Sequence, residues 1–307
     1  MTKFHTTSTL IFLLAFSRTL AQDRDTTIMG MHFKMDEVVI KSAKNGWDVN
    51  GFIRRMKEDT TFYKAFLGLR MVGYTSDNEI SFFDEKGKTI AHLENRTEQT
   101  MRGNCRTVNI SKEKVTGDYY DRKKKPRYYT AELMQNLFFR TRENECGQSD
   151  LIKQSNTVKG QLEKHKEQLK QLVFNPGSKV EGIPLIGKKA SVFEDKGVRQ
   201  RYDFRLKFVQ YQGEECYFFQ AIPKEEYKDE VVYNQLDTWF RVSDYSIVAR
   251  DYALSYSTIF YDFNVVMKVR LEKAGTRLLP SSIDYRGNWH IFSKKRERSK
   301  FNILFDY

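Results

Sequence analysis

The stretch Ser257–Glu272, STIFYDFNVVMKVRLE, carries an apolar residue at every second position from Ile259 onward. The apolar residues are Ile259, Tyr261, Phe263, Val265, Met267, Val269 and Leu271. The positions between them are mostly polar or charged, with Phe260 and Val266 as exceptions. A period of two is the pattern of a β-strand with one buried face and one face in water. The stretch is about twice as long as a usual strand of five or six residues, so the strand is expected to coil with the twist of its sheet.

The same alternation recurs from Ala190 to the C-terminus, for example at Leu236 and Phe240. Further strands are predicted at Arg201–Gln210, Glu215–Ile222, Val231–Val242, Ser246–Leu254, Arg277–Tyr285, Trp289–Ser293 and Phe301–Tyr307. Short turns with a glycine or alanine separate several of them, at Gln212–Glu214, Lys273–Gly275 and Arg286–Asn288. Such turns join neighbouring strands antiparallel. The pattern predicts an α+β fold in which helices accompany a curled antiparallel sheet, a half-barrel or open barrel.

The N-terminal part supplies these helices. Met35–Ile40 reads as a short strand within an otherwise loose segment, residues 22–46. Apolar residues then fall at helical spacing over Val49–Met56, and again over Thr61–Leu69 after Asp59, a candidate N-cap. A hairpin follows, with Asp84–Lys88 as its connection. We expect one half-barrel domain over residues 47–307, with a helical insertion at about 105–185.

The predicted insertion contains a basic loop and two candidate helices. Lys123, Lys124, Lys125 and Arg127 surround a proline and could bind an anionic membrane surface, although such a loop can equally be plain solvated surface. Thr130 is a candidate helix N-cap, and a second, amphipathic helix is expected over residues 160–173.

The first residues indicate export. Lys3 precedes the apolar run Leu10–Phe16, which is too short to span a membrane, and Thr19–Ala21 ends in a typical cleavage site. A signal peptide over residues 1–21 is therefore predicted, with the mature chain in the periplasm or associated with the cell envelope. The first cysteine is Cys105, so we expect no N-terminal lipidation. The net charge of +12 favours an anionic membrane surface over nucleic acid, for which no binding motif is present.

The 3 cysteines leave one unpaired in an oxidising compartment. Cys105 and Cys146 could form a disulfide, and Cys216 reads as a small buried residue within an apolar run. No C-x-x-C pair or Cys/His cluster indicates a metal site. The sequence also lacks the motifs of serine hydrolases, zinc proteases, P-loops and dinucleotide-binding folds. We therefore expect a non-catalytic protein without a cofactor.

The order of the C-terminal strands resembles the periplasmic lipoprotein carriers, the LolA/LolB-like half-barrels. The resemblance lies in Tyr202–Phe204, Cys216–Phe219, Thr238–Val242, Leu279–Pro280 and Tyr285–Trp289. This chain is longer, and the carriers lack the insertion at 105–185. The resemblance implies an apolar concave face, lidded by helices, that accepts acyl chains.

Two functions remain open at this point. In the first, the protein carries a lipid or a lipidated polypeptide, with an outer-membrane or envelope protein as a further partner, and its ligand contacts Ile259, Tyr261, Phe263, Val265, Met267, Val269, Leu236 and Phe240. In the second, the same residues form an ordinary filled core. The protein is then a non-catalytic envelope scaffold or interaction module.

Overall fold

The computed structural model describes residues 24–135, 138, 145–146, 172–178, 186–258, 261–291 and 295–307. The predicted signal peptide lies outside the described residues, as do Ile259 and most of the helix predicted over 160–173. The strand containing Tyr261 is described, but its side chain is not.

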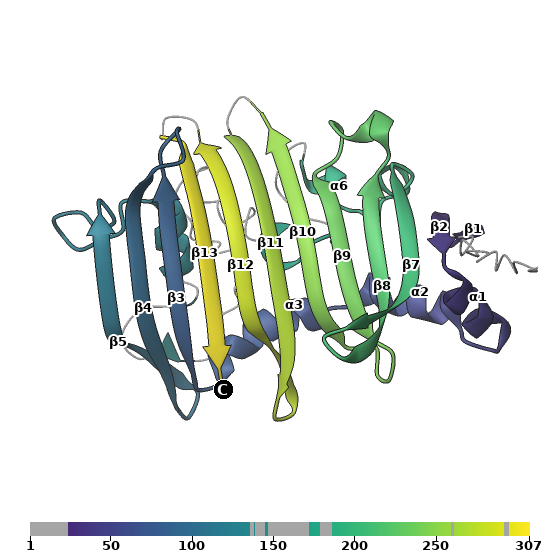
Figure 1. The fold of residues 1–307 in the computed structure, drawn as a ribbon, viewed down its shortest axis with the longest axis horizontal. Coiled ribbons are helices and arrows are strands. Elements are labelled where there is room, and N and C mark those ends of the chain that lie inside the picture. The colour runs from purple at the N-terminus through teal and green to yellow at the C-terminus, as the bar shows by residue number, and fades with distance from the viewer. Residues whose placement is uncertain are drawn as a thin grey trace, which may run out of the picture.

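The described strands form one 13-stranded sheet in the order β1-β2-β7-β8-β9-β10-β11-β12-β13-β3-β4-β5-β6 (Figure 1). Their bounds are β1 Arg24–Ile28, β2 Met31–Met35, β3 Tyr74–Phe83, β4 Thr89–Arg102, β5 Cys105–Gly117, β6 Glu145–Cys146, β7 Tyr202–Tyr211, β8 Glu214–Pro223, β9 Tyr233–Arg241, β10 Ile247–Ser257, β11 Tyr261–Ala274, β12 Arg277–Ile291 and β13 Glu297–Asp306. Every described pairing is antiparallel except that of β2 with β7. The sheet ends at β1 and β6 and does not close, which confirms the predicted open half-barrel.

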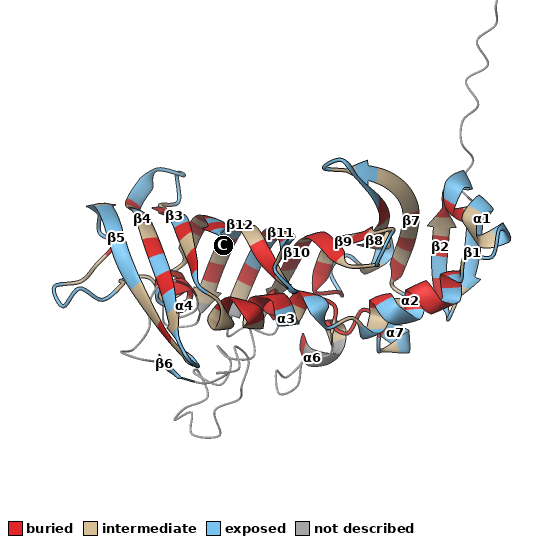
Figure 2. Ribbon diagram, turned by 90° about the horizontal axis from the view of Figure 1, so that it is seen from below, coloured by how far each residue is buried: buried red, intermediate tan, exposed pale blue. Residues whose placement is uncertain are grey.

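Helices lie along one side of this sheet (Figure 2). They are α1 Glu37–Lys44, α2 Val49–Glu58, α3 Thr61–Gly68, α4 Tyr129–Met134, α6 Ile186–Lys189 and α7 Lys196–Arg199, with 3₁₀ turns at Leu69–Met71 and Glu225–Tyr227. The predicted helices over Val49–Met56 and Thr61–Leu69 are thus confirmed as α2 and α3. The N-cap position of α3 is Thr60 and not Asp59 as predicted, but the Asp59 Oδ1 still accepts a hydrogen bond from the Thr61 amide at 3.0 Å.

Strand β11 has the two faces that its sequence predicts. Phe263, Val265, Met267, Val269 and Leu271 are at most 6% exposed, and the first four form a stripe on what we call the inner face. Val266, between two of them, is 37% exposed on the outer face. With 14 residues the strand is about 46 Å long at about 3.3 Å per residue.

The predicted turn at Arg286–Asn288 is wrong, because these residues continue β12. Gly287 faces inward between Tyr285 and Trp289, and a Cβ built on it would lie 2.1 Å from the Tyr285 hydroxyl oxygen. The missing side chain lets the Trp289 Nε1 donate to the Tyr285 hydroxyl above it. The glycine is therefore needed for packing within a strand.

The strand predicted at Met35–Ile40 is also wrong, because β2 ends at Met35 and α1 begins at Glu37. Asp36 explains the boundary. Its Oδ1 accepts from the Val39 amide at 2.8 Å, which caps the helix, and its Oδ2 accepts from the Phe208 amide at 2.7 Å. The described part of the predicted loose segment is accordingly a hairpin followed by a helix.

The insertion predicted at 105–185 begins as part of the main sheet. Cys105–Gly117 forms β5, which pairs with β4 along its length. Its side chains are mostly exposed on both faces, so it lacks the apolar alternation that marks the other strands. Thr130 lies inside α4, and Tyr128 holds the N-cap position instead. The Glu297 carboxylate accepts from the Tyr129 and Thr130 amides.

Candidate ligand trough

Three separate segments cover the inner face of the central strands: α3, Phe138 and Leu172–Phe174, together called the cover here. Its aromatic rings pack on rings of the sheet and on one another. Phe62 of α3 lies edge-on to Tyr252, with ring centroids 6.2 Å apart. Phe66 lies 5.0 Å from Phe174, and Phe138 lies 6.3 Å from Phe305. The interior is thus bounded by a sheet on one side and, among the described residues, by this cover on the other.

The predicted ligand-contacting residues whose side chains the structure describes all face this interior. Phe263, Val265, Met267 and Val269 belong to one contiguous apolar cluster, which Leu236 and Phe240 join from β9. Leu236 is 1% exposed and Phe240 2%, so these side chains are packed in this structure. The geometry brings the predicted residues together on one face, and ligand binding to them stays a prediction.

Buried tyrosines hold parts of the cover to the sheet. The Tyr233 hydroxyl donates to the Leu172 carbonyl at 2.7 Å, and the Tyr252 hydroxyl donates to the Val173 carbonyl. We call this pair the tyrosine latch. Nearby, the Tyr74 hydroxyl reaches the Phe138 carbonyl at 3.4 Å. Burial raises the pKa of Tyr74 to about 12 and also raises the pKa values of Tyr233 and Tyr252, so all three hydroxyls keep the proton they donate.

A charged side chain also lies on the inner face of the central strands. Arg250 of β10 is only 6% exposed, and its Nε donates to the Thr238 hydroxyl at 3.0 Å. Its guanidinium lies over the ring of Phe62, 4.6 Å from the centroid. Burial lowers the pKa of Arg250. Arg250 shares the inner face of β10 with Tyr252 and Leu254, so the alternation of this strand in the sequence predicts its inward position.

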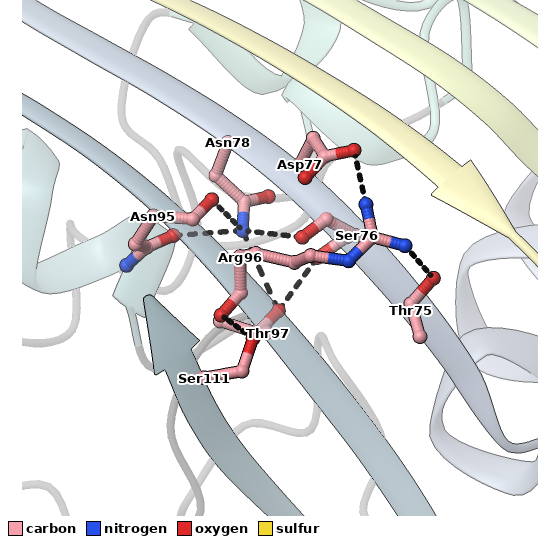
Figure 3. Close-up of polar contacts among 8 residues, drawn as sticks. All are labelled: Thr75, Ser76, Asp77, Asn78, Asn95, Arg96, Thr97 and Ser111. Atoms are coloured by element: carbon pink, nitrogen blue, oxygen red, sulfur yellow. Dashed lines mark hydrogen bonds and ion pairs between the residues drawn. The ribbon is translucent and has the colours of Figure 1, made fainter. Parts of the chain in front are cut away.

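On β3 and β4 the inner face is apolar at Ile80 and Leu93 but polar further along both strands (Figure 3). Ser76 Oγ and Thr97 Oγ1 are 2.6 Å apart, and Asn78 Nδ2 donates to Asn95 Oδ1 at 2.8 Å. Asn78 Oδ1 is buried and accepts no hydrogen bond. On the outer face of the same strands, Arg96 pairs with Asp77 at 2.6 Å. The trough lining is therefore apolar beside β11 and hydrogen-bonding beside β3.

Three described hollows lie on the outer face of the sheet. The largest, about 490 Å³, is lined by charged residues that include Asp77, Arg96 and Lys112. Val266 and Arg286 line both of the others. In the described part of the chain, no cluster of three or more His, Cys, Asp or Glu side chains could hold a metal ion. No described helix is long and apolar enough to cross a membrane.

The predicted basic loop is an exposed turn. The Asp121 carboxylate accepts from the amides of Lys123 and Lys125, each at 2.8 Å, and these bonds fix the turn. Lys123, Lys124, Lys125 and Arg127 all point into solvent. Their exposure fits contact with an anionic surface, which stays a prediction.

The structure joins Cys105 of β5 to Cys146 of β6 by a disulfide. This bond fastens the described edge strand β6 to the sheet. Cys216 is free and fully buried, and burial raises the pKa of its thiol. Its packing matches the expectation of a small buried residue.

Comparisons with known proteins bear on the fold. No protein family and no curated protein matches the sequence. Among solved structures, the chain is similar to a DUF1329 family protein from Desulfovibrio piger ATCC 29098, which is 12% identical over 80% of this chain and 90% of that one, at a TM-score of 0.25. A putative outer membrane lipoprotein-sorting protein domain from Vibrio parahaemolyticus is 7% identical over 81% of this chain and 93% of that one, at a TM-score of 0.26. A LolA superfamily protein from Nitrosomonas europaea is 8% identical over 80% of this chain and 92% of that one, at a TM-score of 0.21.

The resemblance is to a distant LolA-like fold. The half-barrel assignment rests on the strand order and the two-faced strands described above.

Proposed function

We propose that this chain is an exported, non-catalytic binding protein that takes up the acyl chain of a lipid or a lipidated polypeptide. The acyl chain lies between the inner face of the sheet and the cover. The observation that carries the proposal is the construction of this interior: an apolar sheet face that is covered by α3, Phe138 and Leu172–Phe174 rather than by a second sheet. A ligand can displace such a cover without unfolding the sheet.

The energetics of exchange support this proposal. The contacts between the cover and the sheet are mostly apolar, and apolar contacts are non-directional, so an acyl chain can replace them. Burying an acyl chain of about 15 methylenes stabilises the complex by roughly 12 kcal/mol. The tyrosine latch opposes displacement of Leu172–Phe174 by two hydrogen bonds, each worth about 1 kcal/mol.

The proposed setting is the periplasm or the cell envelope, reached through the predicted signal peptide over residues 1–21. The exposed basic loop at Lys123–Arg127 would then meet anionic headgroups, and an outer-membrane or envelope protein would exchange the ligand with the trough.

Removing the tyrosine latch is expected to tighten acyl binding. The double variant Tyr233→Phe/Tyr252→Phe lacks both hydroxyls but keeps both rings, so less free energy opposes displacement of Leu172–Phe174. We expect the apparent affinity for a fluorescent long-chain fatty acid to rise roughly 30-fold in an equilibrium titration, which corresponds to the loss of about 2 kcal/mol. Tyr227→Phe is the matched control, because Tyr227 lies in a 3₁₀ turn with no buried residues and its substitution is expected to leave the affinity unchanged.

Native mass spectrometry of protein purified from its own envelope tests the proposal independently. Bound acyl species of defined mass are expected. If wild-type protein carries no acyl chain and takes none up at micromolar concentrations, the proposed function is wrong.

A second candidate, an envelope interaction module with a permanently filled interior, is favoured by the tight packing of the stripe. Phe263, Val265, Met267 and Val269 are at most 1% exposed, and the three described hollows lie on the outer face. This candidate predicts a co-purifying protein and no bound lipid, so the mass spectrum decides between the two.

A further inference from the structure

Arg250 places a positive charge on the inner face beside the apolar stripe of β11. Burying an ionised group without a counter-charge costs several kcal/mol, and buried charges in proteins are therefore usually paired. Within the described part of the chain, no carboxylate forms an ion pair with Arg250. Asp59 is the acid that acts on it electrostatically, but the Asp59 carboxylate binds the amide and hydroxyl of Thr61 at the start of α3.

The guanidinium has a free edge. Its flat face lies against the Phe62 ring, and its Nε donates to Thr238. Of its five N–H donors, the Nε–H is the one with a described hydrogen bond. The two terminal nitrogens together present the planar fork that binds carboxylates and phosphates through two parallel hydrogen bonds.

The strand register places this fork next to the apolar stripe. Arg250 pairs with Thr238 of β9 on one side and with Val269 of β11 on the other. From Val269 the apolar stripe runs along the inner face over Met267 and Val265. An anionic group at Arg250 would therefore stand at one end of a continuous apolar path.

We propose that Arg250 binds the anionic headgroup, a carboxylate or a phosphate, of a single-chain lipid whose tail lies along the stripe from Val269 toward Phe263. This inference rests on the proposed function and narrows its ligand to an anionic lipid. In the proposed complex, the Phe62 ring keeps its contact with the flat face of the Arg250 guanidinium, and the headgroup binds the two terminal nitrogens at its edge.

The test compares three ligands that share one chain length: a fatty acid, the corresponding fatty alcohol and a lysophospholipid with a terminal phosphate. Titrations use wild-type protein, Arg250→Met and Arg250→Lys. Wild type is expected to bind at least one of the two anions ten or more times more tightly than the alcohol. The preferred anion identifies the headgroup as carboxylate or phosphate.

Arg250→Met is expected to lower anion affinity to that of the alcohol while alcohol binding persists. Arg250→Lys, which keeps the charge but loses the fork, should fall between. Arg270→Met is the matched control, because Arg270 lies on the outer face of the adjacent strand and pairs with Asp251. It should leave the ratio of anion to alcohol affinity unchanged.

Equal affinity of wild type for both anions and the alcohol would overturn the role of Arg250 and leave the proposed function standing. Failure of all three ligands to bind would instead overturn the proposed function. The ratio of anion to alcohol affinity is measured on the wild-type protein, so the test remains decisive even if Arg250→Met does not fold.

Discussion

Replacing Val265 with aspartate is expected to unfold the protein. Val265 is fully buried on the inner face. A carboxylate at this position would have no contact with water and, among the described residues, no cation with which to form an ion pair. Burying the charge costs several kcal/mol, and the lost apolar side chain costs about 2 kcal/mol more. The sum is comparable with the whole stability of a typical domain, about 5–15 kcal/mol.

The matched control is its neighbour, Val266→Asp, because Val266 is 37% exposed on the outer face. This substitution should change the free energy of unfolding by no more than about 0.5 kcal/mol. Urea unfolding followed by far-ultraviolet circular dichroism measures both variants. Similar effects of the two substitutions would contradict the assignment of the two faces of β11.

Gly287→Ala is expected to destabilise the protein by about 1–3 kcal/mol, a large effect for one added methyl group. The new Cβ would lie 2.1 Å from the Tyr285 hydroxyl oxygen and 2.6 Å from ring carbon Cζ, so the ring must move. Tyr285 is only 1% exposed and has little room, and its movement would break the hydrogen bond from Trp289. The midpoint of urea unfolding measures the loss.

A double-mutant cycle isolates this contact. In a Tyr285→Ala background the ring is gone, and the added methyl should cost far less than in wild type. Arg286→Ala, an exposed position on the same strand, controls for general effects on β12 and should be close to neutral. A Gly287→Ala variant as stable as wild type would contradict the packing described around Tyr285.

The strands of the C-terminal half were predictable because each strand buries one face and exposes the other to solvent. In β11 and β9 this alternation alone placed Val265 and Leu236 inside. Gly287 was misassigned as a turn residue because glycine has the same sequence signal in a turn and in a tightly packed strand. Only the positions of Tyr285 and Trp289 in three dimensions separate the two cases.

Other features of the structure were not predicted from the sequence, for different reasons. Strand β5 is exposed on both faces, so it shows no alternation to detect. The Asp36 cap was available in the sequence, with Val39 three residues later, but the run of β-branched residues that follows favoured a strand. The tyrosine latch depends on residues about 60–80 positions apart meeting across the trough, and no local pattern predicts such contacts.

Quenching of tryptophan fluorescence by a brominated acyl chain is the most direct test of the central claim, that a ligand lies against the inner face. Trp289 faces inward and packs 4.9 Å from Phe263, whereas Trp239 lies on the outer face against Phe218. Two variants are compared, each retaining one of these tryptophans, with Trp47 and the other replaced by phenylalanine. The account predicts quenching of Trp289 and little change at Trp239. Quenching of Trp239 instead, or bound lipid that quenches neither, would contradict it.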